Sequence, residues 1–128
     1  MPFRVLIVDD YPAIRRAVRS LLASRDDFEV CAEAENGAEG VERSAELKPD
    51  VVLLNISMPV MNGFEAARDI GVVSPRSRVV ILSSETDKRL MEEARNVGAV
   101  SYVSKSDIDR DLIAAIEGAA NGRSTVVW

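Results

Sequence analysis

Short apolar runs and amphipathic stretches alternate five times along the chain. The apolar runs span residues 3–8, 28–34, 51–56, 78–82 and 99–103, and the amphipathic stretches span residues 12–24, 38–48, 63–70, 87–97 and 108–121. In the first amphipathic stretch, apolar side chains recur at helical spacing and share one face: Ile14, Val18, Leu21 and Leu22. The alternation predicts five strands and five helices, which is typical of an α/β protein with a parallel sheet.

Residues that favour helix ends lie close to the expected boundaries. Pro12 suits the first turn of a helix, and Asn36 followed by Glu39 resembles a capping box. Asn62 precedes the third expected helix, and Gly98 stands where a left-handed residue would end the fourth. These signals support the helix assignments independently of the apolar pattern.

The pattern of apolar and polar residues in the expected strands indicates their order in the sheet. Residues 5–8, 51–54 and 79–82 are continuously apolar, as in strands that helices cover on both faces. Residues 28–33 alternate in polarity and residues 99–104 carry serines, so these two strands should lie at the edges. With right-handed crossovers, the order 2-1-3-4-5 of a flavodoxin-like, doubly wound (βα)5 sheet satisfies both conditions.

Length, charge and residue usage narrow the range of functions. The chain has 128 residues, which predicts one domain over residues 1–121, followed by a tail or truncated linker at 122–128. A net charge of −5 argues against direct binding of nucleic acid, and no apolar run approaches the length of a membrane span. The start lacks a secretory signal, so we expect a cytoplasmic protein. One cysteine and no histidine exclude an internal disulfide, a conventional zinc site and histidine acid–base chemistry.

Polar residues stand where four of the expected strands end. They are Asp9 and Asp10, Asn55 and Ser57, Ser83 and Ser84, and Lys105. In an open parallel sheet, ligands bind beyond the carboxyl ends of the strands, where the strand order reverses. Carboxylates suit Mg²⁺, and hydroxyls and an ammonium suit phosphoryl oxygens, so the set predicts a magnesium and phosphoryl site. Each residue alone is explained as well by a turn or a helix cap, but four such signals at one edge are not.

Segments 8–10, 49–63 and 98–105, together with Ser83, resemble bacterial response regulator receiver domains, and the resemblance covers almost the whole chain. The stretch from Met58 to Gly63 is its most specific part. The last helix, with the residues that follow it, resembles receivers that precede a helix-turn-helix DNA-binding domain. The resemblance implies a phosphorylation-controlled signalling switch that is not an enzyme.

The same resemblance implies a role for each site residue. Asp10 would bind Mg²⁺ directly and Asp9 largely through water, and the Ser57 backbone carbonyl would complete the protein ligands. Ser83 and Lys105 would contact the phosphoryl group. Ser83 and Tyr102 would form a switch pair, in which the hydroxyl moves toward the phosphoryl group and the ring turns inward.

The sequence departs from the receiver pattern at two positions. Asn55 stands where the family has its phosphoacceptor aspartate, so we expect that acyl phosphate formation fails. Its amide oxygen would be a weaker Mg²⁺ ligand than a carboxylate, which predicts a lowered affinity. An engineered substitution and a natural one both stay open, and the otherwise complete site favours the former. Ser106 stands where many members have proline, so no cis peptide is expected there.

The resemblance also implies partners. We expect docking to a sensor histidine kinase or phosphotransfer protein through the first helix, which carries Arg15 and Arg19, and we also consider a homodimer. Two alternatives remain: a natural phosphorylation-independent pseudo-receiver that binds protein partners, and a Mg²⁺-dependent phosphoryl-transfer enzyme.

Overall fold

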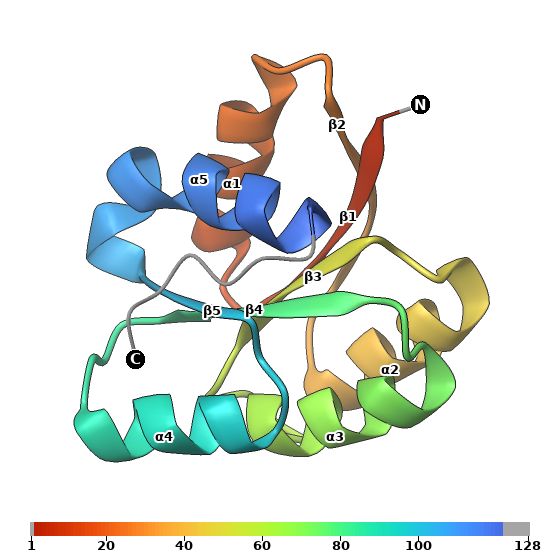
Figure 1. Ribbon diagram of the computed structural model, residues 1–128, viewed down its shortest axis with the longest axis vertical. Coiled ribbons are helices and arrows are strands. Elements are labelled where there is room, and N and C mark those ends of the chain that lie inside the picture. The colour runs from red at the N-terminus through yellow and green to blue at the C-terminus, as the bar shows by residue number, and fades with distance from the viewer. Residues whose placement is uncertain (1, 122–128) are drawn as a thin grey trace.

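Five parallel strands form one sheet in the order β2-β1-β3-β4-β5, with helices on both of its faces (Figure 1). This computed structural model describes residues 2–121. The strands are β1 (Phe3–Val8), β2 (Phe28–Ala34), β3 (Val51–Asn55), β4 (Arg78–Ser83) and β5 (Ser101–Ser104). The helices are α1 (Pro12–Ala23), α2 (Gly37–Leu47), α3 (Gly63–Val73), α4 (Lys88–Asn96), the 3-10 turn η1 (Lys105–Asp107) and α5 (Ile108–Ala120). The predicted fold class and strand order are confirmed, and the expected tail at 122–128 lies outside the described residues.

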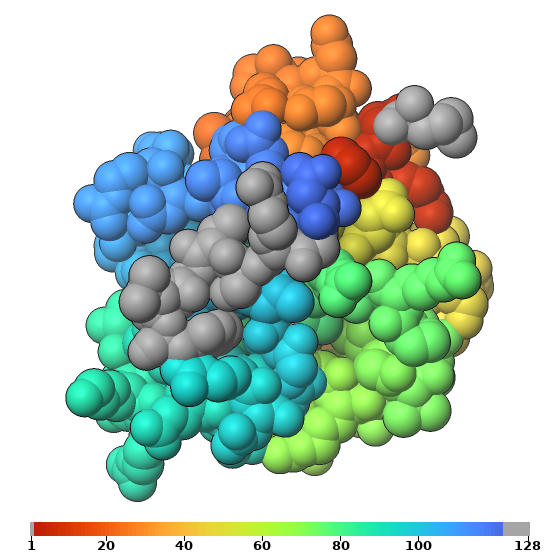
Figure 2. All heavy atoms as spheres, viewed as in Figure 1, coloured from red at the N-terminus to blue at the C-terminus, as the bar shows by residue number. Residues whose placement is uncertain are grey.

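Alternate residues of the central strands build two separate apolar cores. Val5, Ile7 and Leu53 face α1 and α5, whereas Leu6 and Leu54 face α2, α3 and α4. Both sets are buried, which explains why the central strands are continuously apolar. Figure 2 shows α5 beside α1 and α4 beside α3 on the molecular surface.

The helix ends follow the capping signals. The Asn36 side chain accepts a hydrogen bond from the Glu39 N–H, and Asn62 and Glu65 form a complete capping box at the start of α3. Gly98 has φ 93°, the left-handed conformation expected of it. All described peptide bonds are trans, including the one that precedes Ser106.

A glycine fixes the approach of the loop between β3 and α3. A Cβ atom at Gly63 would lie 2.1 Å from the carbonyl oxygen of Asn55, so only glycine fits there. The Gly63 N–H donates to the Ile56 carbonyl at 2.7 Å. The start of α3 is thus held against the end of β3, which keeps Asn55 at the rim of the sheet.

No helix of the described part of the chain is long and apolar enough to cross a membrane.

Candidate functional site

The carboxyl ends of four parallel strands bring the predicted site residues to one edge of the sheet. β1 pairs with β3 so that Val8 lies beside Leu54, which sets Asp9 next to the end of β3 at Asn55. β4 ends at Ser83, and Lys105 follows directly after β5. Residues that are far apart in the sequence therefore meet because the strands run in parallel and end together.

Asp9 is the most deeply buried acidic group of the site, with 1% of its surface exposed. Its Oδ1 atom accepts a hydrogen bond from the Tyr11 N–H at 2.9 Å. Its Oδ2 atom lies 2.9 Å from the Lys105 ammonium, yet accepts no aligned hydrogen bond within residues 2–121. We therefore treat this contact as an ion pair whose strength comes from charge and burial rather than from hydrogen-bond geometry.

Lys105 is enclosed on two sides. Its side chain is only 10% exposed, because one side faces Asp9 and the other faces Tyr11. The Lys105 Nζ atom lies 4.9 Å from the centroid of the Tyr11 ring, within the range of a cation–π interaction. Tyr11, which is 58% exposed, thus places its ring against the Lys105 ammonium.

Asn55 is buried and presents its amide nitrogen to two oxygens. Its Nδ2 atom donates to Asp10 Oδ1 at 3.1 Å and to the Ser57 backbone carbonyl at 2.9 Å. The structure therefore joins Asn55, Asp10 and Ser57 in one hydrogen-bonded group. The sequence predicts that the amide oxygen faces a metal ion, whereas in the structure the amide nitrogen faces the two oxygens.

The residues expected to form a switch pair meet at the backbone of Glu85. Its N–H donates to the Ser83 hydroxyl at 3.1 Å, and its carbonyl accepts from the Tyr102 hydroxyl at 2.6 Å. Tyr102 lies inward with 7% exposure. Burial raises the pKa of Tyr102, and a hydrogen bond with Ser83 lowers it by less. Within the described residues, no hydrogen bond links the Ser83 hydroxyl to Asn55 or Lys105.

Residues 5–117 match the response regulator receiver domain family. The chain belongs to this family.

Relatives of this receiver occur in regulators of several kinds. It is 35% identical over 121 residues to the nitrate/nitrite response regulator protein NarL of Escherichia coli strain K12, covering 94% of this chain and 56% of that protein. It is 34% identical over 133 residues to a protein-glutamate methylesterase/protein-glutamine glutaminase of Methanococcoides burtonii, covering 97% and 38%. The chain thus spans about half or less of these two relatives.

Solved structures agree with this assignment. The receiver superimposes on a LuxR-family two-component response regulator from Aurantimonas sp. SI85-9A1 with a TM-score of 0.91. The sequences are 31% identical, and the match covers 97% of this chain and 89% of that one.

Receiver domains generally bind Mg²⁺ at their acidic phosphorylation pocket. The residue types present here, two carboxylates and a backbone carbonyl, are those that Mg²⁺ prefers. As arranged, however, Lys105 neutralises Asp9, and the Asn55 amide is bonded to Asp10 and to the Ser57 carbonyl. No cluster of three or more acidic, histidine or cysteine side chains able to hold a metal occurs in residues 2–121. The arrangement therefore does not fit a bound cation.

The arginines expected to dock a partner are engaged within the receiver. Arg15 is 13% exposed, pairs with Glu33 of β2 at 3.0 Å and donates to the Asp9 carbonyl at 2.6 Å. Arg19 pairs with the same carboxylate, while Arg16 is exposed. Arg15 thus contacts the Asp9 backbone and Glu33, and of the three arginines of α1 it is Arg16 and Arg19 that are exposed.

Sequence reasoning missed three supporting groups: Tyr11, the Glu33 carboxylate and the Glu85 backbone. An aromatic residue directly after the acidic pair was a usable signal for Tyr11. No side-chain pattern points to Glu85, because it acts through its backbone N–H and carbonyl.

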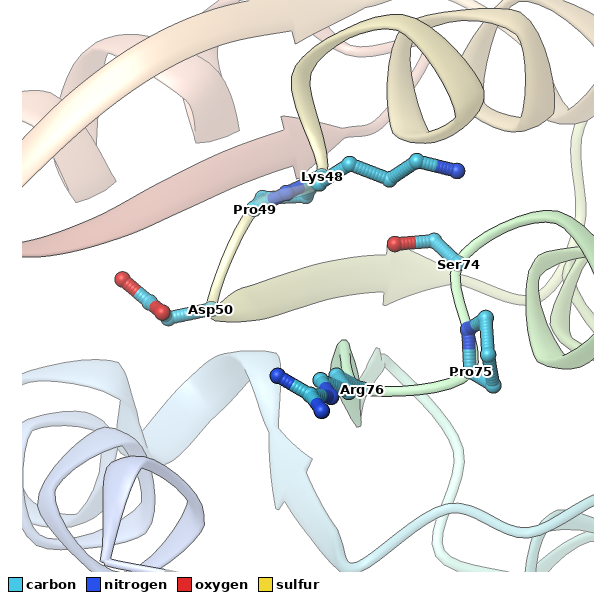
Figure 3. Close-up of a pocket in the computed structure, with 6 residues that line it drawn as sticks. All are labelled: Lys48, Pro49, Asp50, Ser74, Pro75 and Arg76. Atoms are coloured by element: carbon cyan, nitrogen blue, oxygen red, sulfur yellow. The ribbon is translucent and has the colours of Figure 1, made fainter.

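A surface pocket of about 420 Å³ lies at the opposite edge of the sheet, where β3 and β4 begin (Figure 3). Its lining residues are Lys48, Pro49, Asp50, Ser74, Pro75 and Arg76. None of the candidate site residues lines this pocket, so it is separate from the candidate site.

Proposed function

We propose that this chain is the receiver of a two-component response regulator in which Asn55 prevents phosphorylation. The observation that carries the proposal is the position of Asn55, which ends β3 between the acidic pair and the strand that leads to Ser83. A carboxylate at this position would be the nucleophile of an acyl phosphate. An amide has no anionic oxygen and its nitrogen lone pair is delocalised, so it does not replace that nucleophile.

The remaining groups suit phosphoryl transfer. This reaction needs little from a protein beyond an in-line nucleophile and stabilisation of charge on the phosphoryl oxygens. Lys105 supplies a buried ammonium, and Ser83 supplies a hydroxyl at the end of the neighbouring strand. Since only the nucleophile is missing, one substitution should restore the reaction.

The test is intact-mass spectrometry of the chain and of its Asn55→Asp variant, each with acetyl phosphate and Mg²⁺. We expect a gain of one phosphoryl group for the Asn55→Asp variant alone, which is lost on adding a chelator. Ser20→Ala in the Asn55→Asp background is the control, because Ser20 is exposed on α1 and is not among the polar residues at the strand ends. Efficient labelling of the Asn55 chain, or none of the variant, would overturn the proposal.

The output of this receiver is proposed to be control of a DNA-binding domain beyond residue 121. Support comes from the resemblance of the last helix to receivers that precede a helix-turn-helix DNA-binding domain, and from the NarL relative, of which this chain covers only 56%. The receiver itself is proposed to be a cytoplasmic, non-enzymatic module that contacts neither nucleic acid nor membrane. The methylesterase relative does not change this, because the match covers only 38% of that protein.

A sensor histidine kinase or phosphotransfer protein is the proposed partner, and a homodimer is a second one. Charge reversal at Arg16 should weaken kinase binding with little loss of stability, since Arg16 is exposed. Arg19 is left unchanged in this test because it pairs with Glu33. Arg15 is unsuitable for this test because its loss would also disturb Glu33 and the Asp9 backbone.

A second candidate function is a pseudo-receiver that binds its partner without phosphorylation. The observation that favours it is the inward position of Tyr102, whose hydroxyl donates to the Glu85 carbonyl in a chain that has no carboxylate at position 55. Partner binding that is the same for the Asn55 chain and for a phosphorylated Asn55→Asp variant would support this function.

A further inference from the structure

The oxygens that would bind a divalent cation already have partners within this chain. Asp10 Oδ1 and the Ser57 carbonyl both accept hydrogen bonds from Asn55 Nδ2, at 3.1 and 2.9 Å. Asp9 Oδ2 lies 2.9 Å from the Lys105 ammonium. The neutral Asn55 amide thus contacts two of these oxygens, and the Lys105 ammonium contacts the third.

The orientation of the Asn55 amide follows from its neighbours. A carboxylate and a backbone carbonyl only accept hydrogen bonds, so the amide nitrogen must face them. A reversed amide would set its oxygen against two oxygens and leave two acceptors without their donor. A carboxylate at position 55 has no such donor, which makes this arrangement a property of asparagine.

We propose that the Asn55 amide group takes the place of the divalent cation in this receiver and obstructs metal binding. The inference rests on the proposed function, because it deepens the role of the same site. A cation that binds Asp10 Oδ1 and the Ser57 carbonyl from the side that faces Asn55 has to displace the amide from both hydrogen bonds. On the Asp9 side, the Lys105 ammonium, held beneath the Tyr11 ring, opposes the cation by like charge.

The test measures Mn²⁺ affinity by calorimetry, with Mg²⁺ as competitor, for the chain with Asn55 and for its Asn55→Ala variant. If the amide obstructs the site, removing it raises Mn²⁺ affinity by roughly fivefold or more, although one oxygen is lost with it. If Asn55 instead serves as an oxygen ligand, the same variant binds more weakly. Equal or weaker binding by Asn55→Ala overturns the proposal.

Two further variants test whether a gain in metal affinity comes from loss of the amide and arises at the Asp10 site. Asn55→Gly also lacks the amide and must change affinity in the same direction, with circular dichroism showing that each variant is folded. Asp10→Ala in the Asn55→Ala background must abolish the gain, and a gain that persists overturns the assignment of the site. Asn96→Ala is the matched control, since Asn96 is exposed at the end of α4.

The outcome is separable from that of the phosphorylation experiment. Metal affinity is measured on variants that lack any acceptor, whereas phosphorylation is measured on Asn55→Asp. A phosphorylated Asn55→Asp variant combined with weakened metal binding by Asn55→Ala would uphold the proposed function and refute this inference. An Asn55→Asp variant that is not phosphorylated, combined with stronger metal binding by Asn55→Ala, would uphold this inference and refute the proposed function.

Discussion

The Lys105 ammonium forms an ion pair with the buried carboxylate of Asp9, with 2.9 Å between Nζ and Oδ2. Asp9 is 1% exposed and the Lys105 side chain 10% exposed, so water screens this pair little. Because Asn55 is neutral, it offers the ammonium no competing negative charge. Lys105 therefore compensates a buried charge in this receiver, whatever else it does toward a phosphoryl group.

Removing the ammonium should destabilise the fold. Lys105→Ala leaves the Asp9 carboxylate buried without its partner, and breaking such a pair costs about 3 kcal/mol. Urea unfolding of the variant measures this loss. Lys88→Ala, at the exposed start of α4, is the control and should change the unfolding free energy by less than about 0.5 kcal/mol. A loss for Lys105→Ala no larger than that of the control would contradict the ion pair.

The Tyr102 hydroxyl should make stability depend on alkaline pH. Burial raises the pKa of Tyr102 above its ordinary value of 10.0, so the folded state disfavours the phenolate. The stabilising contribution is fully present below the unfolded pKa and is lost as the pH rises toward the folded pKa. Tyr102→Phe should cost about 1 kcal/mol at neutral pH, from the lost bond to Glu85, and should lose less stability on going to pH ~11.

The measurement is the midpoint of urea unfolding of the unsubstituted chain and of Tyr102→Phe, each at neutral and alkaline pH. Tyr11→Phe is the matched control, because Tyr11 is 58% exposed. Equal alkaline losses for the parent chain and for Tyr102→Phe would show that Tyr102 does not titrate differently in the folded state.

Much of the fold can be predicted from the sequence because buried positions are occupied by apolar residues. Strands covered on both faces are continuously apolar, as in residues 51–54, whereas the edge strand β2 alternates. Once the strand order is known, parallel strands must end together, so Asp9, Asn55 and Lys105 converge without any knowledge of side chains.

The details of the site could not be predicted in the same way. Whether Asn55 presents nitrogen or oxygen depends on neighbours brought together only by folding. The sequence predicts that Arg15 contacts a partner, but its position on α1 places it against Glu33 of β2. Helical spacing gives the face of a residue, not the partner that a neighbouring strand supplies.

Two helix glycines should respond to alanine in opposite directions. A Cβ atom at Gly71 would meet nothing within 4 Å, so Gly71→Ala should stabilise the fold by about 0.5–1 kcal/mol through helix propensity. A Cβ atom at Gly40 would lie 2.9 Å from Val8 Cγ1, so Gly40→Ala should destabilise it by roughly 1–3 kcal/mol. Thermal unfolding measures the change in stability of each variant. A change of the same sign for both would contradict the packing of α2 on β1.

Asn55→Asp should make the stability of the receiver depend on divalent cations. The substitution removes the donor to Asp10 and Ser57 and adds a third carboxylate to the site. Without metal, the lost hydrogen bonds and the like charges should lower the unfolding free energy by about 1–3 kcal/mol. Millimolar Mg²⁺ should recover most of that loss in the variant, since a cation that binds only the folded state stabilises it. The given chain should gain little, because the Asn55 amide already serves the same oxygens. Urea unfolding with Mg²⁺ and with a chelator measures the difference, and an equal gain for both chains would show that the Asn55 site binds the cation as the carboxylate site does.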